Sequence, residues 1–168
     1  MKCLDCRRDN VKKTVFLFVL LVFLISSCGL LFKTPSLPGS FSLKSALLIL
    51  DGFQYPLTSV VKVNEVYGAK LGNGICGMFE NFNGTFYVFK YVSSNVAKSN
   101  WKNFRKQVGG PLKINYLTYS WLDRGYFQVK YKSIDIISWW KDNWLFIITG
   151  KDAKEFFNYI NEVYGEIK

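Results

Sequence analysis

The chain of 168 residues contains no histidine. Histidine is the general base of serine and cysteine hydrolase triads and the commonest nitrogen ligand of protein-bound metals. Its absence excludes those triads and every metal site that depends on imidazole. A phosphate loop is also missing, because Gly72-Asn73-Gly74 is not followed by Lys-Ser or Lys-Thr.

Cysteine is scarce as well, with four residues in the chain. Cys3 and Cys6 form one CxxC pair near the N-terminus, whereas a structural metal site needs about four ligands. Beyond residue 28, Cys76 stands alone beside Ile75 and close to Met78, so we expect a small core residue. The spacing makes no disulfide framework, and we predict no metal and no cofactor.

Carboxylates are the remaining groups that could catalyse a reaction. Glycosidases use a pair of them, and the candidates in this chain are Glu80, Asp123, Asp135 and Asp142. Asp123 and Asp142 fall in predicted turns, where aspartate commonly bonds to nearby backbone. An enzyme would need two carboxylates in one cleft. We therefore predict a non-enzymatic protein without catalytic residues.

What the chain does have is a distinctive N-terminus. Five basic residues precede an apolar run over 15–25, and small residues follow it. This order is typical of a secretory signal peptide. The segment also resembles the lipobox of bacterial lipoproteins, in the residues Ile25-Ser26-Ser27-Cys28. That resemblance implies cleavage before Cys28 and attachment of a diacylglycerol to its thiol.

An uncleaved membrane span is the alternative. Residues 14–32 carry no charge, and a run of this length is near the lower limit of about 17–20 residues for crossing a bilayer. The basic start stays in the cytoplasm in either case. We therefore expect a signal peptide at 1–27 or an anchor reaching residue 32. A membrane tether follows at 28–42 and a single domain at 43–168, in the periplasm or at the cell surface.

The chain is strongly basic, with a formal net charge of +10. The predicted leader holds five basic and two acidic residues, so residues 28–168 keep 17 basic against 10 acidic residues. Outside the cytoplasm such a surface favours anionic lipid headgroups or acidic polymers, and we expect no nucleic acid partner. The simpler interpretation is a solvated surface that keeps the domain soluble.

Periodicity divides the first half of the domain into short elements. The apolar residues 43–50 follow Ser42 and fit either a short helix or a strand. The valine-rich residues 57–67 favour a strand. A hairpin is predicted where two β-rich runs flank the turn Asn81-Phe82-Asn83-Gly84, at 75–80 and 85–92.

An amphipathic helix is predicted over 95–108. Its apolar residues recur at helical spacing, namely Ala97, Trp101, Phe104 and Val108. Beside that face runs a basic stripe, which we consider a candidate surface for a membrane or a protein partner: Lys98, Lys102, Arg105 and Lys106. An ordinary solvated helix face would have the same pattern.

The second half of the domain predicts four strands and a closing helix over 151–164. The strands are expected at 113–121, 126–132, 134–140 and 144–149. The last two are apolar on both faces, which is typical of central strands covered on both sides. Adjacent tryptophans in a strand point to opposite faces. The core is the default place for them, and a ligand groove lined by Trp139, Trp140 and Trp144 is the alternative.

The order of elements predicts an α+β domain, in which helices pack on an antiparallel sheet. In that order the domain resembles the Mog1/PsbP-like sandwich, and a TATA-binding-protein-like curved sheet is the alternative. The first resemblance implies adaptor or accessory roles rather than one chemistry. We therefore predict an extracytoplasmic lipoprotein that binds an envelope protein partner, with a small-ligand binder as the alternative.

Overall fold

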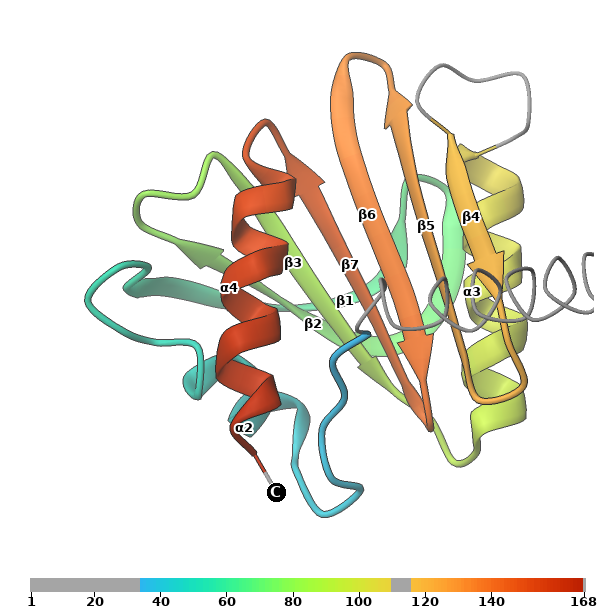
Figure 1. The fold of residues 1–168 in the computed structure, drawn as a ribbon, viewed down its shortest axis with the longest axis horizontal. Helices are drawn as coiled ribbons and strands as arrows, with labels where there is room; N and C mark the ends of the chain where they lie inside the picture. The colour runs from blue at the N-terminus through green and yellow to red at the C-terminus, as the bar shows by residue number, and fades with distance from the viewer. Residues whose placement is uncertain (1–33, 110–115, 168) are drawn as a thin grey trace, which may run out of the picture. The chain divides into compact units, whose positions relative to one another are not determined.

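A seven-stranded sheet forms the centre of the protein (Figure 1). The computed structural model describes residues 34–109 and 116–167, and Thr34–Lys168 form one compact unit. The predicted leader, with its lipobox and Cys28, lies outside the described residues. The strands are β1 Leu57–Val66, β2 Ala69–Phe79, β3 Gly84–Lys90, β4 Leu117–Ser120, β5 Arg124–Tyr131, β6 Ile134–Lys141 and β7 Trp144–Gly150.

The strand order across the sheet is β1-β2-β3-β7-β6-β5-β4. Every pair of neighbours is antiparallel. The last strand along the chain, β7, therefore lies between β3 and β6, where it joins a three-stranded N-terminal ribbon to a three-stranded C-terminal one. The predicted α+β class with an antiparallel sheet is confirmed.

Helices cover both faces of this sheet. The helix α3, Ser94–Val108, lies on one face, and α4, Ala153–Gly165, lies on the other together with the short helix α2, Leu43–Leu48 (Figure 1). Two hydrophobic cores result. Trp139 belongs to the core under α2 and α4, and Trp140 belongs to the core under α3. The prediction that β6 and β7 are central strands covered on both sides is confirmed.

Side-chain caps explain where two of the helices begin. The hydroxyl of Ser42 accepts a hydrogen bond from the backbone N–H of Ser45, so residues 43–48 form a helix rather than a strand. The hydroxyl of Ser93 accepts in the same way from the N–H of Val96 at the start of α3. Both satisfy a donor that the first helical turn leaves unpaired.

The predicted hairpin joins β2 to β3, but its backbone differs in detail from the expectation. The positive φ of 62° falls on Asn81, not on the Asn83-Gly84 pair. Gly84 is needed for another reason: a Cβ there would overlap the carbonyl oxygen of Thr149 on β7. Tight strand pairing at this position therefore requires glycine.

Two element lengths differ from the sequence prediction. The strand β2 begins at Ala69, six residues before the predicted start at 75, and it bends at Gly72, where φ is 81°. The described part of β4 covers Leu117–Ser120, whereas the prediction was 113–121 and residues 113–115 lie outside the described residues.

Candidate functional site

The predicted basic stripe on α3 divides into two kinds of residue. Lys98 and Arg105 are half-buried and lie over the rings of core tryptophans, with the Lys98 ammonium 5.3 Å from the centre of Trp140 and the Arg105 guanidinium 5.0 Å from that of Trp101. Lys102 and Lys106 extend into solvent. Two of the four cations therefore serve helix packing, and two remain for contact with another molecule.

The favoured prediction that the tryptophans lie in the core is confirmed, and the alternative of a tryptophan-lined groove is wrong. Trp139, Trp140 and Trp144 are all 0% exposed and belong to the two cores. The reason is that helices cover both faces of β6 and β7, so no ring on these strands reaches the surface. The Nε1 of Trp139 donates to the carbonyl of Pro35 at 2.9 Å, which ties the ring to the N-terminal segment.

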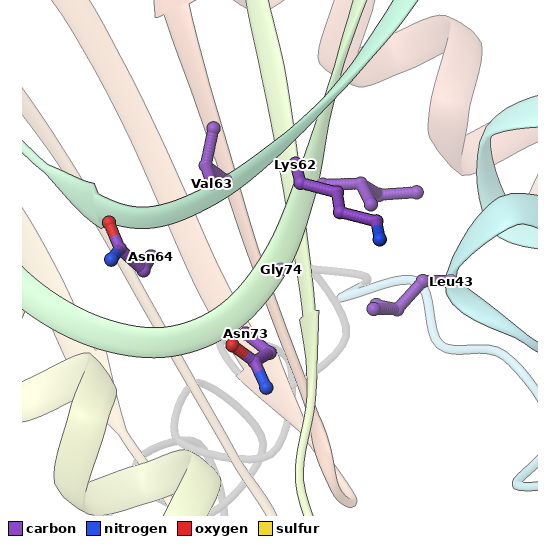
Figure 2. A pocket seen from close by; sticks show the side chains of 7 residues that line it. Leu43, Lys62, Val63, Asn64, Asn73 and Gly74 are labelled. Atoms are coloured by element: carbon purple, nitrogen blue, oxygen red, sulfur yellow. The ribbon is translucent and has the colours of Figure 1, made fainter.

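A pocket of about 490 Å³ lies on the outer ribbon formed by β1 and β2 (Figure 2). Figure 2 shows Lys62 and Asn64 on one strand, Asn73 on its neighbour, and Leu43 reaching in from α2. Sequence analysis missed this site, although Gly72-Asn73-Gly74 marks the bend that shapes it. One ammonium and two amides offer hydrogen bonds and a single positive charge to a polar or anionic ligand.

The N-terminal segment 34–41 is fastened to the sheet. Thr34 and Leu37 are each 3% exposed. The hydroxyl of Ser36 donates to the Asp142 carboxylate at 2.9 Å, and the Lys90 ammonium donates to the carbonyls of Gly39 and Phe41. The prediction of a free tether over 28–42 is therefore wrong from residue 34 onward, because these residues pack in spite of their polar composition.

Three loops meet at the end of the sheet where Lys90 pairs with Trp144, and we call this end the loop edge. It consists of the β3–α3 connection 91–93 with the first turn of α3, the β4–β5 turn 121–123 and the β6–β7 turn 142–143. Backbone hydrogen bonds connect them in series, from Tyr91 to Asn143 and from Asp142 to Asp123. Ser36 contacts the same edge through Asp142.

The loop edge carries exposed apolar side chains. Trp121 is 65% exposed, Leu122 is 87% and Val92 is 96%. Val96, in the first turn of α3, is 37% exposed. Sequence analysis placed Trp121 at the end of a strand and missed this surface. The signal was present, because a Trp-Leu pair directly before the Asp-Arg-Gly turn has no neighbouring element to cover it.

The candidate carboxylates separate into two groups. Asp123 and Asp142 lie in adjacent turns of the loop edge, whereas Asp135 pairs with Gly150 at the opposite end. Glu80 follows β2, which β3 and β7 separate from the strand of Asp135. The guanidinium of Arg124 binds Asp123 at 2.9 Å and, mainly through this hydrogen bond, lowers the pKa of that carboxyl. Asp142 is bound by Ser36. Both carboxylates of the loop edge therefore have structural partners.

Cys76 is buried in β2, as predicted, and desolvation raises the pKa of its thiol.

Within the described residues, no group of three or more histidine, cysteine or carboxylate side chains is arranged to hold a metal ion. In the same part of the chain, none of the helices combines the length and the apolar character that a membrane crossing requires.

Comparison with known proteins places most of the chain in one family. Residues 38–167 match the family described as "Protein of unknown function (DUF3242)". The chain belongs to this family. A search of curated proteins finds no match. Among solved structures, the chain is similar to the crystal structure of a GTP binding regulator from Thermotoga maritima, with 26% identity and a TM-score of 0.66. The similarity covers 78% of this chain and 93% of the other.

Proposed function

We propose that this DUF3242 protein is a membrane-anchored domain that acts outside the cytoplasm by binding a partner at the membrane surface, without catalysis. The observation that supports this most strongly is the fastening of residues 34–41 to the sheet. An anchored domain gains from a short connection, because a short connection holds its surface at the bilayer.

The length of the free connection follows from that fastening. If Cys28 carries the lipid, six residue steps separate it from the buried Thr34, and an extended chain spans at most about 20 Å over this distance. If residues 14–32 instead cross the bilayer, the free connection is two steps, or about 7 Å. A domain so close to a membrane meets partners in or on that membrane.

The surface charge and the comparisons support a binding role. Lys102 and Lys106 extend from α3 into solvent, where they attract anionic groups. The similar Thermotoga protein is named a GTP binding regulator, and a regulatory role of this kind would be exerted through binding. We infer that an envelope protein partner docks beside the membrane.

The first test is the intact mass of membrane-extracted protein compared with that of a Cys28→Ala variant. A mature chain that begins at Cys28 and carries lipid, and that is lost in the variant, would support the lipoprotein. A chain of full sequence mass in both proteins would indicate the single span. Cys3→Ala is the matched control and should leave the mature mass unchanged. Recovery of the wild type only in a soluble fraction would contradict both forms of anchoring.

A second candidate function is the binding of a polar, anionic ligand in the pocket of Figure 2. The observation that favours it is the placement of Lys62, Asn64 and Asn73 around about 490 Å³, a size typical of small-molecule sites. Because the similar structure is titled a GTP binding regulator, GTP is the first ligand to titrate. Lys62→Ala should weaken binding, whereas Lys70→Ala, an exposed lysine of the same ribbon, should not. Equal binding by both variants would contradict this site.

A further inference from the structure

The loop edge presents an arrangement of side chains that a folded domain does not need for its own stability. Trp121 begins a tight turn, with Leu122 and Asp123 at its tip, and the N–H of Trp121 closes the turn by donating to the carbonyl of Arg124 at 2.7 Å. Exposure of this much apolar surface on neighbouring residues is unfavourable in water. Large exposed apolar side chains that cluster at one place mark an interaction surface.

The chemistry of these residues fits the surface of a bilayer. Tryptophan prefers the interface between headgroups and acyl chains, because its ring is apolar and its N–H can still bond to water or a headgroup. Leucine beside it can enter the acyl region. Arg124 and Lys141 flank the turn, but their charges are balanced by Asp123, which is paired with Arg124, and by Asp142. The apolar side chains of Trp121 and Leu122 therefore supply the attraction to the bilayer interface.

The rigidity of the turn also suits insertion. The turn is bound to the neighbouring β6–β7 turn through the backbone of Asp123 and Asp142, and that turn is bound to Tyr91 through Asn143. The polar β6–β7 turn thus holds the apolar residues of the other two loops in fixed positions before any contact is made. Little conformational entropy is lost when such a surface docks.

The position of the proposed anchor favours a bilayer, rather than a protein, as the surface that contacts the loop edge. The segment that leaves the domain toward the anchor is fastened on the loop edge, by the hydrogen bond of Ser36 to Asp142. Its free part reaches at most about 20 Å from Thr34 to a lipid on Cys28. The membrane that receives the anchor is therefore the first large surface within reach of Trp121 and Leu122.

We propose that the loop edge docks into the bilayer interface, with the Trp121-Leu122 turn inserted among lipid headgroups. The inference rests on the proposed membrane anchoring and extends it, because it assigns the surface and the orientation of the domain. The α3 face and the pocket on β1 and β2 stay in water and remain open to a partner.

The protein carries its own probe for this proposal. Of its five tryptophans, Trp121 is 65% exposed and the other four are 0% exposed: Trp101, Trp139, Trp140 and Trp144. The experiment uses the full chain incorporated into vesicles of phosphatidylcholine and phosphatidylglycerol. Tryptophan emission is quenched from inside the bilayer by brominated lipid, or from the water by iodide.

We expect brominated lipid to quench the emission of Trp121, so that the lipid-quenched fraction of the total emission disappears in Trp121→Phe. Iodide should quench little of the Trp121 emission. Leu122→Ser should lower the lipid-quenched fraction severalfold. The matched control is Phe53→Trp in the Trp121→Phe background. Phe53 is 102% exposed before β1, whose first residue pairs with Phe79 at the opposite end of the sheet. A tryptophan there should be quenched by iodide alone.

Two results would overturn the proposal. In the first, the chain enters vesicles but Trp121 stays open to iodide. In the second, Trp121 is shielded in native membranes but not in lipid vesicles, which assigns the surface to a protein partner. A chain that does not enter vesicles at all contradicts the membrane anchoring itself, so the two failures are distinguishable.

Discussion

The strands β7 and β1 have comparable shares of β-branched residues, three of seven and five of ten, yet their environments differ completely. Every residue of β7 is buried, whereas β1 has one buried residue, Val66, and leaves Val60 and Val61 40% and 49% exposed. The difference comes from position in the sheet: β7 has a strand on each side and helices on both faces, while β1 is an edge strand. Apolar composition thus sets the capacity for burial, and topology decides whether it is used.

The largest expected effect comes from removing a ring at the centre of the sheet. Trp140→Ala should lower the free energy of unfolding by about 3–5 kcal/mol, since a fully buried ring is replaced by a cavity. Trp121→Ala is the matched control at the loop edge and should change it by less than about 0.5 kcal/mol. Urea unfolding followed by circular dichroism measures both. Equal losses would contradict the contrast between centre and edge.

The second test adds a methyl group where β2 contacts its neighbour. A Cβ on Gly74 would overlap the ring of Phe89 and approach the carbonyl oxygen of Val88, so Gly74→Ala should destabilise the protein by about 1–3 kcal/mol. At Gly39 nothing lies within 4 Å of the added Cβ, and the same substitution should be nearly neutral. Thermal unfolding of the two variants compares them. A neutral Gly74→Ala would mean that the ribbon is loosely packed.

Alkaline pH should lower the free energy of unfolding of the unsubstituted protein, because it ionises buried tyrosines. Burial raises the pKa of Tyr119 to about 12 and also raises the pKa of Tyr164 well above its usual value of 10. Because the folded protein keeps these protons longer than the unfolded chain, stability is full below pH 10 and falls as the pH rises. We expect Tyr119 to contribute a loss of about 1 kcal/mol at pH 11, after allowance for its partial exposure. Urea midpoints at pH 9 and pH 11 test the direction, and equal midpoints would refute it.

The smallest expected difference in stability is between the loss of a buried hydrogen bond and the loss of a similar exposed one. The Ser138 hydroxyl donates to the carbonyl of Phe146 at 2.9 Å inside the core, and the Thr58 hydroxyl donates to that of Met78 at 3.0 Å on the exposed ribbon. Ser138→Ala should cost about 1 kcal/mol, and Thr58→Ala less than about 0.5 kcal/mol, because water can replace the exposed bond. Urea unfolding with replicate midpoints resolves the difference. A larger loss at Thr58 would reverse the interpretation.

The sequence predicts most of the fold and little of the functional surface. Periodicity located α3, α4 and the strands of the second half, because alternation and helical spacing are local properties. It could not place β7 between β3 and β6, since strand order depends on pairing between distant segments. It also assigned Pro35 to a free tether, because the donor that holds this residue, the Nε1 of Trp139, lies 104 positions away along the chain.

The tryptophans show the same limit for the candidate site. Alternation correctly put Trp139 and Trp140 on opposite faces, and the apolar character of both faces correctly predicted that the strands are covered on both sides. Only the three-dimensional packing excluded the alternative of a groove beside these rings. The exposure of Trp121 could not be predicted from the sequence, because the exposure of a side chain at a turn depends on what packs beside it. The sequence pattern located the four cations of the basic stripe on α3. Only the three-dimensional packing showed that Lys98 and Arg105 lie over tryptophan rings, whereas Lys102 and Lys106 extend into solvent.

The central place of β7 has a consequence for biosynthesis. While the chain is being made, β3 presents an unpaired edge until residues 144–150 emerge, more than fifty positions later. Such an edge can pair with another chain, which is a route to aggregation. The protein therefore completes its sheet late, and we expect its nascent form to depend on chaperones that shield β3. A chain truncated before Trp144 would leave two ribbons with no strand to join them.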